Sequence, residues 1–144
     1  MRFKPSINLL LEFIRKVDSD FSPPLSDRVD IQGFANKLIN YAEFFCVLDD
    51  HDRIGCLVAL YANDYNSKYA YYPLVATLPS LRGRGFASNL MQESLDYLHG
   101  LSGNIKCAGI HTNNQIACHL YEKSGFNVLN NVNGRYYLEV TITD

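Results

Sequence analysis

Apolar residues near the start of the chain recur at helical spacing. Ile7, Leu10, Leu11, Ile14 and Val17 follow a three-and-four pattern, which predicts an amphipathic helix over residues 6–18. A proline-containing break follows. The next apolar pattern comes directly after a capping aspartate and predicts a second helix over residues 30–41.

The middle of the chain changes to continuous, β-rich apolar runs. Residues 44–48 and 54–61 are separated by the polar segment 49–53, which indicates a hairpin of two antiparallel strands. A third run over residues 69–77 continues the meander, and Pro79 cannot donate a further ladder hydrogen bond.

The last part of the chain alternates between helical and extended patterns. It predicts a helix from Gly83 to Gly100, a strand over 105–111, a helix over 113–124, and strands over 126–129 and 136–143 that flank an Asn133-Gly134 turn. The strands over 69–77 and 105–111, with the helix between them, form a βαβ unit and should be parallel.

These elements predict one α+β domain over residues 1–144. It contains a mixed, mostly antiparallel sheet with a central parallel βαβ unit, flanked by helices. A chain of 144 residues is long enough for one independent core.

Composition and charge exclude several classes of protein. Apolar residues make up 47% of the chain and charged residues 19%, as in ordinary globular proteins. The formal net charge is −2 and no basic run occurs, which argues against a nucleic-acid partner. The longest apolar stretches are far below the ~20 residues that a membrane span needs, and no signal-like segment opens the chain. We therefore expect a cytoplasmic protein with no membrane partner.

The four cysteines lie inside apolar segments without metal-ligand spacing, and we interpret them as reduced core residues. A nucleophilic cysteine could be built from Cys118 with His119 or His111. The sequence around Cys118 does not contain a known nucleophile turn. No metal site is predicted.

A glycine-containing turn stands between the third strand and the following helix. Its sequence is Arg82-Gly83-Arg84-Gly85-Phe86-Ala87. Unpaired N–H groups and the helix dipole favour an anion there, and glycines allow close approach of a pyrophosphate. The spacing matches neither a P-loop nor the dinucleotide fingerprint. By itself the turn could also be a tight connection that binds nothing.

Two motifs carry a resemblance to a known family. Arg82, Gly85 and Ala87 match the Gln/Arg-x-x-Gly-x-Gly/Ala motif, and residues 114–126 match the Asn-x-x-Ala-x-x-Leu-Tyr-x-Lys-x-Gly-Phe pattern. Residues 75–126 therefore resemble the GNAT superfamily, the Gcn5-related N-acetyltransferases. The predicted order of strands and helices agrees with that family's order.

The resemblance implies acetyl-CoA (CoA) as the cofactor. It implies that backbone groups of Val75, Ala76 and Thr77 pair with the pantetheine arm. The amides of Arg82, Gly83, Arg84, Gly85, Phe86 and Ala87 would hold the pyrophosphate. Asn114 would contact the pantetheine. The alternative is that Asn114 caps the following helix, with Asn113 as a competing cap, and one side chain could do both.

Tyr121 is the catalytic acid that the resemblance implies. A neutral phenol, with a pKa near ~10, is available at pH 7 to protonate a departing thiolate whose thiol pKa is near ~8.5. The alternative is a core tyrosine in register with Ala117 and Leu120.

The base that deprotonates the amine is not marked by a motif. Gly109 stands where ribosomal-type members carry a glutamate, and residues 68–72 offer no carboxylate where histone-type members carry one. His111 is the best remaining candidate. Glu43, Asp64 or a water chain are weaker alternatives.

The acceptor is not defined by a motif. Tyr61, Tyr65, Tyr69, Tyr71 and Tyr72 cluster around the second and third strands, where they either pack or line a site for a ring-shaped acceptor such as an amino sugar.

The resemblance implies transfer of acetyl from acetyl-CoA to a primary amine of a small molecule or peptide, by direct attack in a ternary complex. Transfer of a longer acyl group and a non-catalytic CoA-binding sensor or scaffold are the alternatives. The final strands could expose an edge, so both a monomer and a homodimer remain open.

Overall fold

The computed structural model describes residues 1–62, 68–101 and 105–143. Its main elements, in chain order, are α1 (Ile7–Val17), α2 (Ile31–Tyr41), β1 (Glu43–Leu48), β2 (Ile54–Tyr61), β3 (Tyr69–Thr77), α3 (Phe86–Gly100), β4 (Cys107–Thr112), α4 (Gln115–Lys123), β5 (Asn127–Val132) and β6 (Arg135–Thr141). Short 3-10 turns η1 (Asp18–Asp20) and η2 (Leu25–Asp27) link α1 to α2, and η3 (Pro79–Leu81) follows β3.

The six strands form one sheet in the order β1-β2-β3-β4-β6-β5, and β3 and β4 are its parallel pair. This confirms the predicted α+β fold and its central βαβ unit. Two boundaries differ from the prediction. The β4 ladder begins at Cys107, and the amide of Lys106 just before it bonds to Lys68. The final hairpin is tighter than predicted, because Asn133 and Gly134 both adopt positive φ and form a two-residue turn.

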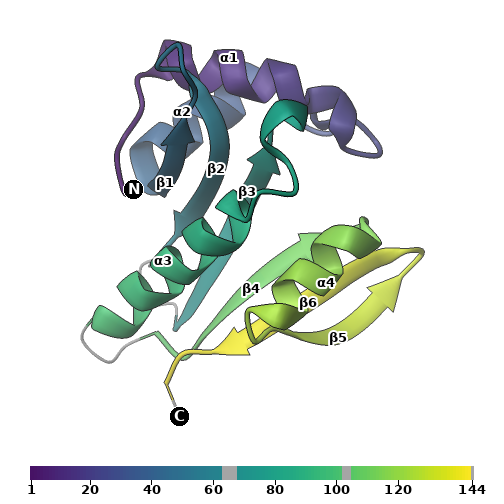
Figure 1. Ribbon diagram of the computed structural model, residues 1–144. Helices are drawn as coiled ribbons and strands as arrows, with labels where there is room; N and C mark the ends of the chain where they lie inside the picture. Colours follow the sequence, from purple (N-terminus) through teal and green to yellow (C-terminus); the bar gives the residue numbers. More distant parts are fainter. Residues whose placement is uncertain (63–67, 102–104, 144) are drawn as a thin grey trace.

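Helices cover both faces of the sheet (Figure 1). The apolar face of α1 packs with α2 against the β1 and β2 face that carries Phe44 and Leu57. On the other face, α3 packs against Phe45 and Val58, and Figure 1 shows α4 beside it, over the β4, β6 and β5 half. Alternation of side chains along each strand thus divides the core into two layers.

A bulge in β3 makes the sheet divide at its centre. Ala59 pairs with Leu74, whereas Tyr61 pairs with Tyr71, so β3 holds one residue more than β2 over this stretch. Pro73 lies inside it and has no N–H for a ladder. The β3–β4 ladder runs from Tyr69 to Tyr72 and its described pairs end there. Beyond this point, residues 74–77 remain paired with β2 alone.

None of the helices in the described ranges is long and apolar enough to cross a membrane.

Candidate active site

A pocket of about 770 Å³ opens where β3 and β4 part. Its walls come from five parts of the chain: the α1–α2 connection, the second half of β3, the turn and first residues of α3, the end of β4 with α4, and the start of β6. The bulge and Pro73 therefore create the pocket, because they end the ladder that would otherwise fill it.

The pocket reaches both faces of the sheet. Tyr72 and Ile110 belong to the core layer under α3 and α4, whereas their neighbours Tyr71 and His111 point to the opposite face. All four residues line the pocket. One end of the pocket is thus formed by α3 and α4, and the other by Tyr71 and His111.

Gly83 and Gly85 shape the turn that precedes α3. Both have positive φ, 74° and 82°, and a Cβ atom on either would meet nothing within 4 Å. The glycines are therefore required by backbone conformation, and the surface above them is open. Gly85 is the N-cap of α3 and has no side-chain cap. The first N–H groups of α3 are free to meet an anion beside the pocket.

The remaining residues of the turn differ in position. Phe86 and Ala87 line the pocket, as do Val75, Ala76 and Thr77 of β3. Arg84 is not part of the lining, and its guanidinium lies 5.1 Å from the centre of the Phe86 ring.

Arg82 acts as a structural link. Its Nε donates to the carbonyl of Thr77 at 3.0 Å, and its guanidinium forms an ion pair of 2.7 Å with Asp20. The side chain thus ties η1 to the end of β3 and holds the α1–α2 connection over the pocket.

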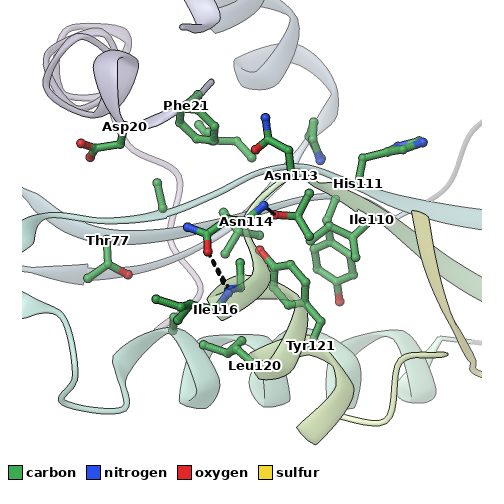
Figure 2. Close-up of a pocket in the computed structure, with 18 of the residues that line it drawn as sticks. Asp20, Phe21, Thr77, Ile110, His111, Asn113, Asn114, Ile116, Leu120 and Tyr121 are labelled. Carbon is green, nitrogen blue, oxygen red and sulfur yellow. Dashed lines mark hydrogen bonds between the residues drawn. The ribbon is translucent and has the colours of Figure 1, made fainter. Parts of the chain in front are cut away.

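Asn114 caps α4, which was the structural alternative to cofactor contact for this side chain. Its Oδ1 accepts hydrogen bonds from the amides of Ile116, at 2.8 Å, and Ala117. Asn114 also lines the pocket, so its side-chain amide nitrogen is available to a ligand there (Figure 2). Asn113 does not compete for the cap, because its side chain donates to the carbonyl of Ser22 across the pocket.

Tyr121 lies on α4, and its hydroxyl points into the pocket (Figure 2). The residue is 5% exposed, and burial raises the pKa of its phenol well above the ordinary value. Its ring packs against Phe126. No hydrogen bond to the Tyr121 hydroxyl is seen among the described residues, so the phenol is a protonated donor that faces the cavity.

His111 lies at the other end of the pocket, in contact with two tyrosines. Its Nδ1 shares a hydrogen bond of 2.7 Å with the Tyr71 hydroxyl, and its ring lies 4.7 Å from that of Tyr137. Burial, followed by the charge of Arg135, lowers the pKa of His111. The imidazole is therefore neutral at pH 7 and can accept a proton.

Tyr137 occupies the space beside Gly109. A Cβ at Gly109 would lie 2.3 Å from the Tyr137 hydroxyl, which donates to Glu139 at 2.7 Å. A glutamate at position 109 would thus clash with this ring. The packing of Tyr137 gives a physical reason for a glycine at position 109.

The cysteine alternative has no geometric support. Burial raises the pKa of each of the four thiols, and the thiol of Cys118 faces Glu122 rather than a histidine. His119 pairs with Glu122 on the exposed side of α4. Within the described ranges, no group of His, Cys, Asp and Glu could hold a metal ion.

The other predicted candidates lie elsewhere. Glu43 contacts Arg2 and Tyr97, outside the pocket. Of the tyrosine cluster, Tyr71 and Tyr72 line the pocket and Tyr72 bonds to Ser94 in the core. Tyr61 packs near Lys37, and Tyr69 is 60% exposed. Asp64 and Tyr65 fall outside the described residues.

Three residues that line the pocket were not predicted from the sequence. These are Phe21 and Arg28 of the α1–α2 connection and Arg135 of the final hairpin. They lie in irregular or hairpin segments far apart along the chain, where no motif marks them.

Comparisons with known proteins agree with this geometry. A family model described as the acetyltransferase (GNAT) family matches residues 10–126. A search of curated protein sequences gives no significant match.

Solved structures with similar folds cover almost the whole chain. A GNAT-family acetyltransferase from Streptococcus pneumoniae superposes with a TM-score of 0.76 at 17% identity, covering 99% of each chain. A chimera of the spermidine N-acetyltransferase SpeG from Vibrio cholerae and hSSAT gives 0.72 at 22% identity, covering 99% of this chain and 95% of the other. Arabidopsis thaliana NAA60, in complex with a bisubstrate analogue, gives 0.73 at 18% identity, covering 98% and 95%. The matched family model spans most of the chain, and the chain belongs to the GNAT acetyltransferase family.

Proposed function

We propose that this protein is an acetyl-CoA-dependent N-acetyltransferase that acetylates a primary amine of a small molecule or peptide. The observation that carries the proposal is the pocket itself. It joins an open glycine turn at the start of α3, a buried phenol on α4, and a neutral histidine on the opposite face.

The residues around the pocket fit the cofactor that the family uses. Gly83 and Gly85 leave open backbone where a pyrophosphate would approach, and the free amides of α3 would hold its charge. The edge of β3 over Val75–Thr77 has no described strand partner on the β4 side. Apart from the Thr77 carbonyl, which accepts from Arg82, the backbone groups on that side are available to amide groups of a pantetheine arm. Bound acetyl-CoA supplies an activated acetyl thioester.

Tyr121 would supply the proton for the departing sulfur. The raised pKa keeps its phenol protonated at neutral pH, and the cavity-facing hydroxyl needs no existing hydrogen bond to be broken. Solvent would return the proton to Tyr121 after each cycle.

His111 would accept the proton that the amine loses, either directly at Nε2 or at Nδ1 through the Tyr71 hydroxyl. The bonds and protons of the transfer then balance. An N–C bond forms, a C–S bond breaks, one proton leaves the amine for His111 and one leaves Tyr121 for the sulfur.

Spermidine N-acetyltransferases and NAA60 are among the proteins of similar fold, and they suggest both small amines and peptides as acceptors to test. The test is thiol release from acetyl-CoA with polyamines, amino sugars, amino acids and peptides, using wild type and Tyr121→Phe. Acceptor-dependent release that falls in the variant supports the proposal. Binding of acetyl-CoA without release for any amine would favour a CoA-binding sensor or scaffold.

A further inference from the structure

Two arginines from different elements line the pocket. Arg28 directly follows η2 in the connection between α1 and α2, and Arg135 is the first residue of β6. Both line the pocket although they are 107 positions apart along the chain. Neither belongs to the motifs that resemble the family's cofactor site.

Both arginines are close enough to Tyr71 for their charges to act on its phenol. Burial raises the pKa of the Tyr71 phenol, while the charges of Arg135 and then Arg28 lower it. Tyr71 is hydrogen-bonded to His111, and the charge of Arg135 also acts on that histidine. The two guanidinium groups therefore lie near Tyr71 and His111 in the pocket.

The two arginines at this end of the pocket have no ion-pair partner among the described residues. The ion pairs of the described residues include neither Arg28 nor Arg135. Asp20 is the carboxylate among the described residues of the lining, and it is already paired with Arg82. Glu139 is not part of the lining, and its carboxylate accepts a hydrogen bond from the Tyr137 hydroxyl behind His111. Among the described lining residues, a cationic ligand would therefore meet two arginines and no unpaired carboxylate.

The charge has two physical consequences for an acceptor. A carboxylate can accept paired, charge-assisted hydrogen bonds from guanidinium groups, whereas a polyammonium chain is repelled. The same positive field lowers the pKa of a nearby amine, which increases the neutral fraction that can attack a thioester. One arrangement thus favours both binding of an anionic acceptor and reaction of its amine.

We propose that the acceptor is a small amine that carries a carboxylate, such as a free amino acid, and that Arg28 and Arg135 hold the carboxylate. This inference rests on the proposed function, which identifies the reacting group of the acceptor as a primary amine. The size of the acceptor follows from the pocket, because about 770 Å³ must also contain the end of the pantetheine arm.

The test compares each of a panel of amino acids with its own amide, which has the same amine and side chain but no carboxylate. Binding to the CoA-saturated protein is measured by saturation-transfer NMR, and thiol release from acetyl-CoA is measured separately. Arg28→Gln, Arg135→Gln and the double variant are compared with wild type. Arg15→Gln is the matched control, because Arg15 is an exposed arginine on α1 outside the pocket.

The expected result is that amino acids bind and their amides bind at least about tenfold more weakly, the size of one charge-assisted interaction. The preference should disappear in the double variant and persist in Arg15→Gln. Equal binding of acid and amide, a preference for polyamines or phosphorylated amines, or no binding of the panel would overturn the inference. Thiol release with a neutral or cationic amine would at the same time uphold the proposed function, so the two failures are distinguishable.

Discussion

The Tyr71 hydroxyl and Nδ1 of His111 lie 2.7 Å apart across the parallel β3–β4 pair. Tyr71 is opposite Gly109 in the ladder, and His111 is the residue just beyond the last pairing of β3, at Tyr72 with Ile110. The hydrogen bond thus spans the point where the two strands separate. It fixes the histidine at the mouth of the pocket.

The pH dependence of acetyl transfer should report on His111. Burial and then Arg135 lower its pKa, so the imidazole becomes protonated only below its ordinary value of about 6.5. We expect kcat/KM to show an acidic limb below about 6.5, in addition to the slope that ionisation of the free acceptor amine causes at neutral pH. His111→Gln should lower the rate and abolish this acidic limb. His51→Gln, in the β1–β2 turn, is the control, and an acidic limb unchanged in His111→Gln would contradict the assignment.

Arg135→Gln should move the same limb. Removing the positive charge leaves burial as the cause that lowers the pKa of His111, so that pKa rises toward its ordinary value. The acidic limb of kcat/KM should therefore shift to higher pH. The comparison is a pH–rate profile of the variant beside Arg15→Gln, and a shift to lower pH would show that the sign is wrong.

Tyr121→Phe should reduce kcat by about 100-fold, the lower range for loss of a general acid. Because no hydrogen bond to the hydroxyl is seen in the described residues and the ring packs against Phe126, the variant should fold and bind acetyl-CoA like wild type. Steady-state kinetics and thermal unfolding measure the two effects. Tyr41→Phe, 71% exposed on α2, should change neither. An undiminished kcat in Tyr121→Phe would remove Tyr121 from the chemistry.

Gly85→Ala should weaken acetyl-CoA binding and lower the free energy of unfolding by about 1–2 kcal/mol. The cause is strain, since φ is 82° and a Cβ meets no atom within 4 Å. Gly100→Ala is the matched control at the other end of α3, where φ is ordinary and the added methyl also meets nothing. Chemical denaturation should show the control to be neutral or slightly stabilised.

Gly109→Ala should displace Tyr137, because the new methyl would lie 2.3 Å from its hydroxyl. The displaced ring loses its hydrogen bond to Glu139 and its contact with His111. We expect destabilisation of about 1 kcal/mol and a lower rate. The added Tyr137→Ala substitution should relieve the strain, and a double-mutant cycle of unfolding free energies measures this coupling. Additive effects would contradict the contact.

The fold was largely predictable from the sequence because its signals are local. The spacing of Leu10, Ile14 and Val17, the polar turn after Leu48 and the Asn133-Gly134 pair each specify an element without reference to distant residues. The parallel pairing of β3 and β4 followed from the helix between them. Residues 82–87 and 114–126 were identifiable because each motif is continuous along the chain.

The acceptor end could not be predicted in the same way. Arg28, Tyr71 and Arg135 come from three separate segments and meet through the bulge at Pro73 and the tight final hairpin. The contact of Tyr137 with Gly109 likewise depends on the register of β6 against β4. Such register and loop positions are tertiary properties that hydrophobic periodicity does not encode.

Calorimetric titration of the protein with acetyl-CoA tests the central claim most directly, because every proposed role depends on this cofactor. The account predicts saturable binding of one molecule per chain, with a dissociation constant between about 1 μM and 1 mM, as is usual for enzyme substrates. Binding should weaken in Gly85→Ala and remain unchanged in Gly100→Ala. Absence of binding by wild type, or equal binding by wild type and Gly85→Ala, would contradict the account.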